Sequence, residues 1–161
     1  MVGEPRSVRG RGPSVARSFE QLEQQLGVLA RQMKRVVADH ADAVHPGLST
    51  SAFLVLSRVA DVGPVRAQAV CSEFVIDKGP VSRSVQQLVD LGLLERRTDP
   101  VDRRAALVSV TPKARLLLAE VEARREVLLA DCLADWRPDE MGALAAGLER
   151  LNAALGSVAR P

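Results

Sequence analysis

The sequence predicts a mostly α-helical protein that carries one small β-hairpin. Only 2% of the residues are aromatic and none is tyrosine, a composition that favours helices packed through aliphatic side chains. Apolar residues recur with alternating spacings of three and four near both ends of the chain. Between them, a turn-rich stretch near residue 100 separates two short segments that look like strands, as in a hairpin. With 161 residues, 47% of them hydrophobic, the chain can form one domain with a core.

The N-terminal region predicts a tail followed by a long helix. Residues 1–13 contain three arginines among Gly, Pro and Ser, and such a segment cannot bury apolar surface, so it should be flexible. A helix is expected from about Ser14 to Val44 because its apolar residues fall on one stripe. The stripe consists of Phe19, Leu22, Leu26, Leu29, Met33 and Val36.

Three shorter helices are expected next. His45-Pro46-Gly47 ends the first helix, and Ser49 can cap a second one that stops near Gly63-Pro64. A third helix is expected over residues 66–73. Asp77 is placed to cap a fourth helix, and the buried face of that helix would consist of Val81, Val85 and Leu88.

The hairpin and two further helices complete the predicted order. Residues 93–97 and 106–110 are the expected strands, and residues 98–102 form the turn between them. Thr111-Pro112 then opens a long helix to about Trp136. Pro138 opens the last helix, which repeats the apolar spacing of the first at Met141, Leu144, Leu148, Leu151 and Leu155.

Two short helices followed by a hairpin have the order of a winged helix-turn-helix, whose second helix enters the DNA major groove. If the apolar side of the fourth helix is buried, Ser82, Arg83 and Gln86 project from the opposite side. Arginine can donate two hydrogen bonds to guanine, glutamine can pair with adenine, and serine can hold a phosphate. A polar helical face is by itself more often only a solvated surface, so the adjoining hairpin carries the prediction.

The hairpin turn holds a second set of candidate DNA contacts. Asp102 could fix a neighbouring arginine so that Arg103 or Arg104 is presented to a narrow minor groove. The alternative is an ordinary charged turn. The full set of predicted DNA-binding residues is Lys78, Gly79, Pro80, Ser82, Arg83, Gln86, Asp102, Arg103, Arg104, Thr50 and Arg66.

From Ser14 to Leu155 the sequence resembles the MarR family of transcriptional regulators. The resemblance rests on Leu48-Ser49, on Asp-Lys-Gly-Pro-Val-Ser-Arg at 77–83, on Leu-Gly-Leu-Leu-Glu-Arg-Arg at 91–97, and on Asp-Pro-Val-Asp-Arg-Arg at 99–104 followed by Val110-Thr111. Gly79 and Pro80 depart from the family, in which many members carry Ser or Thr there. That departure removes two possible side-chain contacts to DNA.

The resemblance implies one domain over residues 14–161, with the winged helix-turn-helix at about 48–111 and dimerisation helices at about 14–44 and 112–157. It implies a homodimer on a pseudo-palindromic operator, usually a repressor, that a small-molecule ligand releases. Arg31 and Arg35 are candidates to line the ligand pocket, although surface ion pairs are the commoner fate of such residues. The expected dimerisation residues are Phe19, Leu22, Leu26, Leu144, Leu148, Leu151 and Leu155.

Several alternatives remain beside this reading. Cys71 or Cys132 could sense oxidants, although both fit small core positions, where a thiol is inert. The winged helix could instead serve protein contacts alone, but the arginines of the fourth helix and the wing argue against that. No catalytic motif, metal-ligand spacing or spanning segment is present, so a cytoplasmic protein that needs no cofactor and is not an enzyme is expected.

Overall fold

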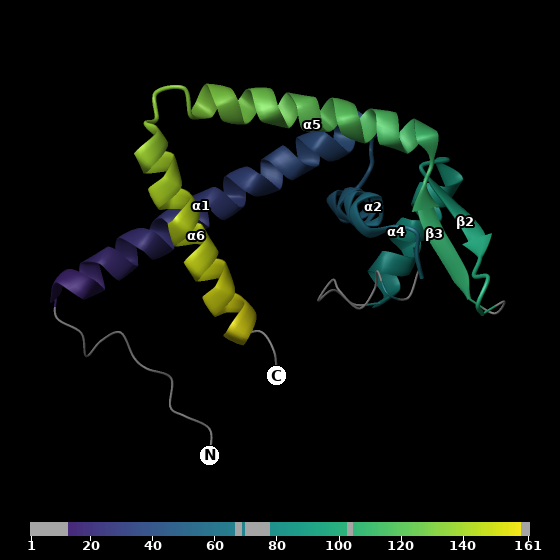
Figure 1. The fold of residues 1–161 in the computed structure, drawn as a ribbon, viewed down its shortest axis with the longest axis horizontal. Helices are drawn as coiled ribbons and strands as arrows, with labels where there is room; N and C mark the ends of the chain where they lie inside the picture. The colour runs from purple at the N-terminus through teal and green to yellow at the C-terminus, as the bar shows by residue number, and fades with distance from the viewer. Residues whose placement is uncertain (1–12, 67–68, 70–77, 103–104, 159–161) are drawn as a thin grey trace, which may run out of the picture. The chain divides into compact units, whose positions relative to one another are not determined.

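The computed structural model describes residues 13–66, 69, 78–102 and 105–158. It divides into two compact units, residues 1–121 and 122–161, and each is described here by itself. The described elements are mostly helices, with one small sheet (Figure 1). The predicted mostly α-helical fold is confirmed.

The first unit begins with helices α1 (Pro13–Val44) and α2 (Thr50–Val62). They lie where the sequence predicts them because the turn chemistry at 45–49 is specific. Gly47 adopts a φ of 78°, in the left-handed region that glycine tolerates best. The Ser49 hydroxyl then accepts a hydrogen bond from the Ala52 amide at 3.2 Å and caps α2.

The third helix was predicted to begin at Arg66, where the structure has a strand. Arg66, its expected first residue, lies in strand β1 (Val65–Arg66). The chain is already extended at Gly63, and Val65 pairs with Val108 while Arg66 pairs with Leu107. Ala69 is helical, but residues 67–68 and 70–77, including the rest of that helix prediction and the Asp77 cap, lie outside the described residues.

The small sheet contains three antiparallel strands in the order β1-β3-β2. Strands β2 (Leu94–Thr98) and β3 (Ala106–Val110) form the predicted hairpin, with Leu94 opposite Val110 and Thr98 opposite Ala106. The sequence missed β1, which covers the other edge of β3. Helix α4 (Lys78–Asp90) precedes this hairpin and contacts both α2 and β2.

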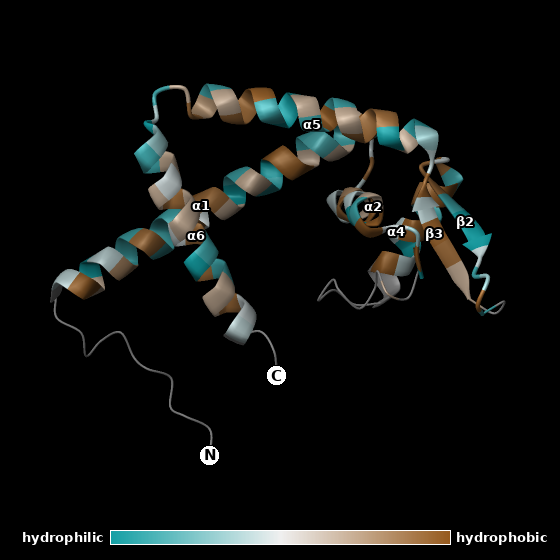
Figure 2. Ribbon diagram, in the orientation of Figure 1, coloured by the Kyte–Doolittle hydropathy of each residue, from teal (hydrophilic) through white to brown (hydrophobic). Residues whose placement is uncertain are grey.

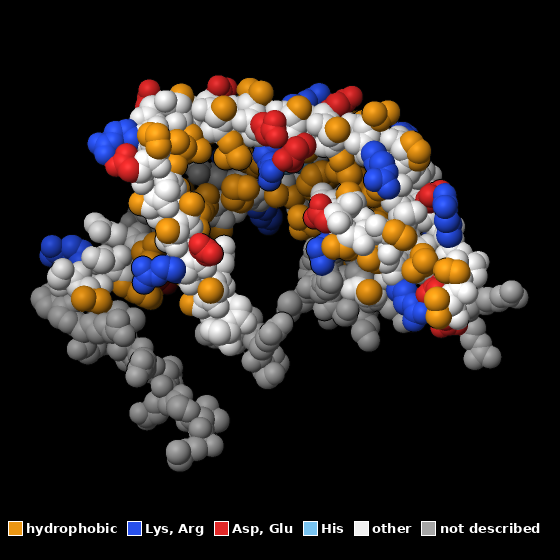
Figure 3. Space-filling model, viewed as in Figure 1, with side chains coloured by type: hydrophobic (Ala, Val, Ile, Leu, Met, Phe, Trp, Pro, Cys, Tyr) orange, Lys and Arg blue, Asp and Glu red, His pale blue; other side chains and the backbone are white. Residues whose placement is uncertain are grey.

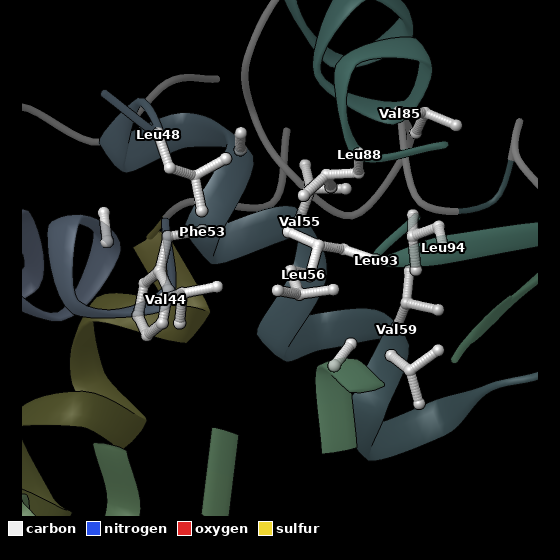
Figure 4. Close-up of a cluster of buried hydrophobic side chains, with 14 of the residues drawn as sticks. Val44, Leu48, Phe53, Val55, Leu56, Val59, Val85, Leu88, Leu93 and Leu94 are labelled. Carbon is white, nitrogen blue, oxygen red and sulfur yellow. The ribbon is translucent and has the colours of Figure 1, made fainter. Parts of the chain in front are cut away.

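The core of the first unit joins α2, α4 and the sheet. Leu56, Leu88 and Leu93 are fully buried and lie together in Figure 4. Val44 and Leu48 extend the cluster to the end of α1. Burial of this kind contributes about 25 cal/mol for each Å² of apolar surface removed from water, so the core holds α4 against α2 and the sheet.

Helix α5 (Pro112–Cys132) begins in the first unit, and helix α6 (Pro138–Val158) belongs to the second. Thr111 caps α5 through its hydroxyl, which accepts from the Ala114 amide at 3.2 Å. Helix α5 ends before the predicted Trp136 because turn hydrogen bonds take over, among them Trp136 N–H to the Leu133 carbonyl at 3.0 Å. The Glu140 carboxylate accepts from the Arg137 amide at 2.9 Å and caps α6.

Among the described residues, no helix is long and apolar enough to cross a membrane. Hydrophobic and hydrophilic residues alternate along α1 (Figure 2), which agrees with an amphipathic helix and not with a spanning one.

Candidate nucleic-acid interface

Helix α4 presents one buried and one exposed face. Val81, Val85 and Leu88 are 3% exposed or less and pack in the core. On the opposite face, Ser82, Arg83 and Gln86 are exposed to solvent. The structure therefore brings together the three polar side chains that the sequence placed on the reading face.

Gln86 carries an additional contact that the sequence analysis missed. Its amide nitrogen donates a hydrogen bond to the Asp90 carboxylate at 2.7 Å, one turn further along the helix. The contact uses one of the two N–H groups of the amide, and the carbonyl oxygen remains available to a base. The i, i+4 spacing of glutamine and aspartate was the signal that could have revealed it.

The wing begins at Asp99, an acidic residue that is only 5% exposed. One carboxylate oxygen accepts from the Val101 amide at 2.8 Å and from the Asp102 amide at 3.4 Å. The other accepts from Nε of Arg66 at 2.8 Å and forms an ion pair with a terminal guanidinium nitrogen of Arg66 at 2.7 Å. The carboxylate thus bonds both the turn of the wing and strand β1.

These contacts set the pKa of Asp99. The hydrogen bond from the Val101 amide lowers the pKa below its ordinary value of 3.8, with further lowering from Arg66 and the Asp102 amide, while burial acts in the opposite direction. Asp99 is therefore ionised at neutral pH, and its negative charge is matched by the Arg66 guanidinium.

Several predicted DNA-binding residues lie close to these elements. The backbone of Lys78, Gly79 and Pro80 forms the first turn of α4. Thr50 is the half-buried first residue of α2. Asp102 is half-buried, and its carbonyl accepts from the Ala105 amide at 2.9 Å. The predictions for Arg103 and Arg104 lie outside the described residues.

The structure shows that Asp99, two residues after the end of the predicted strand, holds Arg66. The predicted role of Asp102 concerns Arg103 and Arg104, which lie outside the described residues, and it stays a prediction. The signal for Asp99 was the Asp-Pro pair at 99–100, because aspartate before a turn accepts hydrogen bonds from the backbone two residues on. Its partner lies 33 residues away in sequence. Nothing in the local pattern identifies Arg66 as that partner.

The predicted dimerisation residues expose apolar surface in the single chain. On α1, Phe19 and Leu22 are 46% and 51% exposed, and on α6 the values for Leu144 and Leu155 are 46% and 58%. Leu148 is also exposed, while Leu26 and Leu151 are half-buried. Hydrophobic side chains are visible on the surface of α5 and α6 in Figure 3.

The structure describes three of the four candidates for ligand binding and redox sensing. Arg31 and Arg35 are exposed on α1. Cys132 is an exposed free thiol at the end of α5, so its expected core position is wrong for the single chain. Cys71 lies outside the described residues. Among the residues that the structure describes, no group of three His, Cys, Asp or Glu side chains is arranged to hold a metal ion.

A helix with a polar face that packs on a second helix and is followed by the hairpin of a three-stranded sheet defines a winged-helix protein. A family model described as the MarR family matches residues 47–105. The chain belongs to the MarR family of winged helix-turn-helix regulators.

A curated relative agrees with this assignment, and a solved structure shares the fold. The HTH-type transcriptional regulator YxaD of Bacillus subtilis is 27% identical over 135 residues, which cover 84% of this chain and 93% of the relative. A MarR regulator from Methanosarcina mazei has a TM-score of 0.71 at 20% identity, covering 86% of this chain and 99% of the other.

A third relative was solved with nucleic acid. FabT of Streptococcus pneumoniae, in complex with DNA, has a TM-score of 0.75 at 17% identity and covers 87% of this chain and 99% of its own. At this identity the likeness shows the fold. The family and its curated relatives are transcriptional regulators and not enzymes, and this chain is a regulator of the same kind.

Proposed function

We propose that this regulator binds a pseudo-palindromic DNA operator as a homodimer, with α4 in the major groove and the wing at the flanking minor groove. The observation that carries the proposal is the exposed Ser82, Arg83 and Gln86 face on a helix whose other side is buried. Because the apolar side of α4 packs in the core, its polar side can enter a DNA groove without breaking any core contact. Membership of the MarR family supports the same use of the helix.

The reading chemistry follows from the side chains on α4. Arg83 can donate two hydrogen bonds to the edge of a guanine, and Gln86 can pair with an adenine. Ser82 and the first-turn backbone of α4 suit phosphate contacts, because amides at a helix N-terminus point outward and favour negative charge. Arg103 and Arg104 are proposed to reach the minor groove beside this site.

A second copy of the chain is the proposed cover for the exposed apolar residues of α1 and α6. Phe19, Leu22, Leu144 and Leu155 would each leave water on dimerisation. A twofold dimer also duplicates α4, and the two copies then read half-sites of the same sequence in opposite directions. Dimerisation therefore accounts for both the apolar surface and a palindromic operator.

Repression is the proposed mode, with release by a small molecule that favours a different spacing of the two α4 helices. Arg31 and Arg35 on α1 are the proposed contacts for an anionic ligand because both are exposed cations. Thiol sensing is the second candidate for the signal. The exposure of Cys132 favours it, because an accessible thiol can be oxidised.

Selection of bound sequences from a random duplex pool tests the proposed function. The expected result is a twofold-symmetric motif with half-sites about one helical turn apart. Repeating the selection with small phenolic acids or with peroxide tests the two proposed signals. Enrichment of no sequence would contradict DNA reading and favour the alternative of a winged helix used for protein contacts.

A further inference from the structure

The carboxylate of Asp99 has its hydrogen-bonding capacity occupied within the chain. One oxygen accepts hydrogen bonds from the Val101 and Asp102 amides, and the other accepts one from Nε of Arg66 and forms an ion pair with a terminal nitrogen of the same guanidinium. The side chain of Asp99 is only 7% exposed. A buried carboxylate with these partners is poorly placed to contact DNA, so we assign its role to the shape of the wing.

The ion pair crosses the sheet. Arg66 ends β1 on one edge, Asp99 follows β2 on the other edge, and β3 lies between them. The amide of Asp99 also donates to the Ala105 carbonyl at 3.0 Å, which closes the base of the turn. Among the ion pairs that the structure describes, the other three join residues two or three positions apart. The Arg66–Asp99 pair alone among these connects distant elements.

We infer that Arg66 and Asp99 form a clamp that positions the wing, so that Arg66 serves DNA binding through Asp99 and not by touching DNA. The inference rests on the proposed function. Nε of Arg66 donates to one oxygen of Asp99, and a terminal guanidinium nitrogen lies 2.7 Å from the same oxygen. The planar guanidinium is therefore restrained in orientation as well as in distance, which the point charge of a lysine would not be. Val101, whose amide is held by Asp99, is 90% exposed at the turn, so the clamp fixes a solvent-exposed part of the wing.

The competing role for Arg66 is a direct phosphate contact, since its side chain is 48% exposed. The two roles predict opposite effects of Asp99→Asn. Removing a negative charge beside a phosphate-binding arginine strengthens attraction to DNA. Removing the same charge from a clamp loosens the wing and weakens binding.

The test measures the affinity of the full-length chain for the duplex enriched by selection, with its flanks intact. The clamp predicts that Arg66→Ala and Asp99→Asn each weaken binding by on the order of tenfold, and that the double variant loses little more than either one. Arg66→Lys should stay well below wild type because an ammonium lacks the two-donor fork. On a duplex shortened to remove the flanking base pairs that the wing is proposed to contact, all variants should bind as wild type does.

Matched controls remove the same charges elsewhere. Arg125→Ala breaks an exposed ion pair with Glu122 in α5, and Asp139→Asn breaks one with Arg137 at the start of α6. Neither substitution should change the ratio of the affinities for the complete and the shortened duplex. Tighter binding by Asp99→Asn, additive losses in the double variant, or near-wild-type binding by Arg66→Lys would overturn the clamp and indicate a direct contact.

Amide hydrogen exchange of the free protein gives a readout that needs no DNA. In Arg66→Lys, exchange at Val101 and Asp102 should accelerate because Asp99 is less firmly held, while exchange at Val85 in the core should not change. Unchanged exchange at Val101 would contradict the clamp. If selection enriches no duplex, the proposed function fails, and this measurement still decides whether Arg66 holds the wing.

Discussion

Arg83 and Gln86 are the residues proposed to read bases. Both are exposed on α4, three positions apart, opposite a side that packs in the core. We expect Arg83→Ala to cost about 1–3 kcal/mol of binding free energy and to relax one base position in each half-site. Selection with the variant, compared with Arg125→Ala as a charge-matched control, measures this. An unchanged motif would remove Arg83 from the reading face.

Asp99 should make stability depend on pH in a defined direction. Its pKa is lowered in the folded protein, chiefly by the Val101 amide and then by Arg66, so its stabilising contribution is fully present above its ordinary value of 3.8. That contribution is lost as pH falls through the lowered pKa. The difference in unfolding free energy between wild type and Asp99→Asn should be constant near neutral pH and shrink below about pH 4.

Urea unfolding at a series of pH values measures the difference between the two proteins. Asp139→Asn provides a comparison at an exposed carboxylate whose pKa is also lowered, by the side chain of Arg137. A gap between wild type and Asp99→Asn that widens in acid would contradict the assigned contacts.

At the residue scale, the sequence predicted the features that follow from the spacing of apolar residues within one helix. The reading face of α4 followed from three apolar residues at helical spacing. The Arg66–Asp99 pair could not be predicted because its partners meet only after β1 and β2 have both joined β3. Whether the individual candidates touch DNA stays a prediction.

At the scale of elements, α4 depends on its buried side. Leu88 is fully buried between α2 and the sheet. We expect Leu88→Ala to lower the free energy of unfolding by about 2–5 kcal/mol, because truncation leaves a cavity in a packed core. Val101→Ala, at a residue 90% exposed, should change it by less than about 0.5 kcal/mol. Equal effects in thermal or urea unfolding would contradict the assigned burial.

Helix starts were predictable where capping chemistry is strong. Ser49 caps α2, and Thr111 with Pro112 opens α5, as their sequences indicate. Strand β1 was not predictable because two residues carry no periodicity, and its pairing with β3 defines it. The end of α5 was placed too late because the turn before Pro138 is stabilised by backbone bonds that sequence spacing does not reveal.

At the scale of the whole molecule, dimerisation should depend on the apolar residues of α6. Leu148 is exposed and Leu151 half-buried in the single chain. The double substitution Leu148→Asp and Leu151→Asp should yield monomers that lose operator binding, because charge cannot be buried in an apolar interface. Sedimentation equilibrium measures the oligomeric state, and circular dichroism checks that the total helix content is unchanged.

Glu149→Ala is the matched control, since Glu149 lies between these residues in sequence and is exposed. It should leave the oligomeric state unchanged. Folded monomers of the double variant that still bind the complete operator tightly would contradict the need for a dimer.

The most direct test of a dimer reading two half-sites from one DNA face is a spacing series. The selected operator is lengthened at its centre by about 5 or about 10 base pairs, half a helical turn or a full one, and affinity is measured at fixed salt. The proposed dimer holds the two α4 helices at a fixed spacing, so we predict that the half-turn insertion lowers affinity to that of a single half-site. Full affinity for the half-turn duplex would show that each chain binds independently and would contradict the proposed dimeric mode.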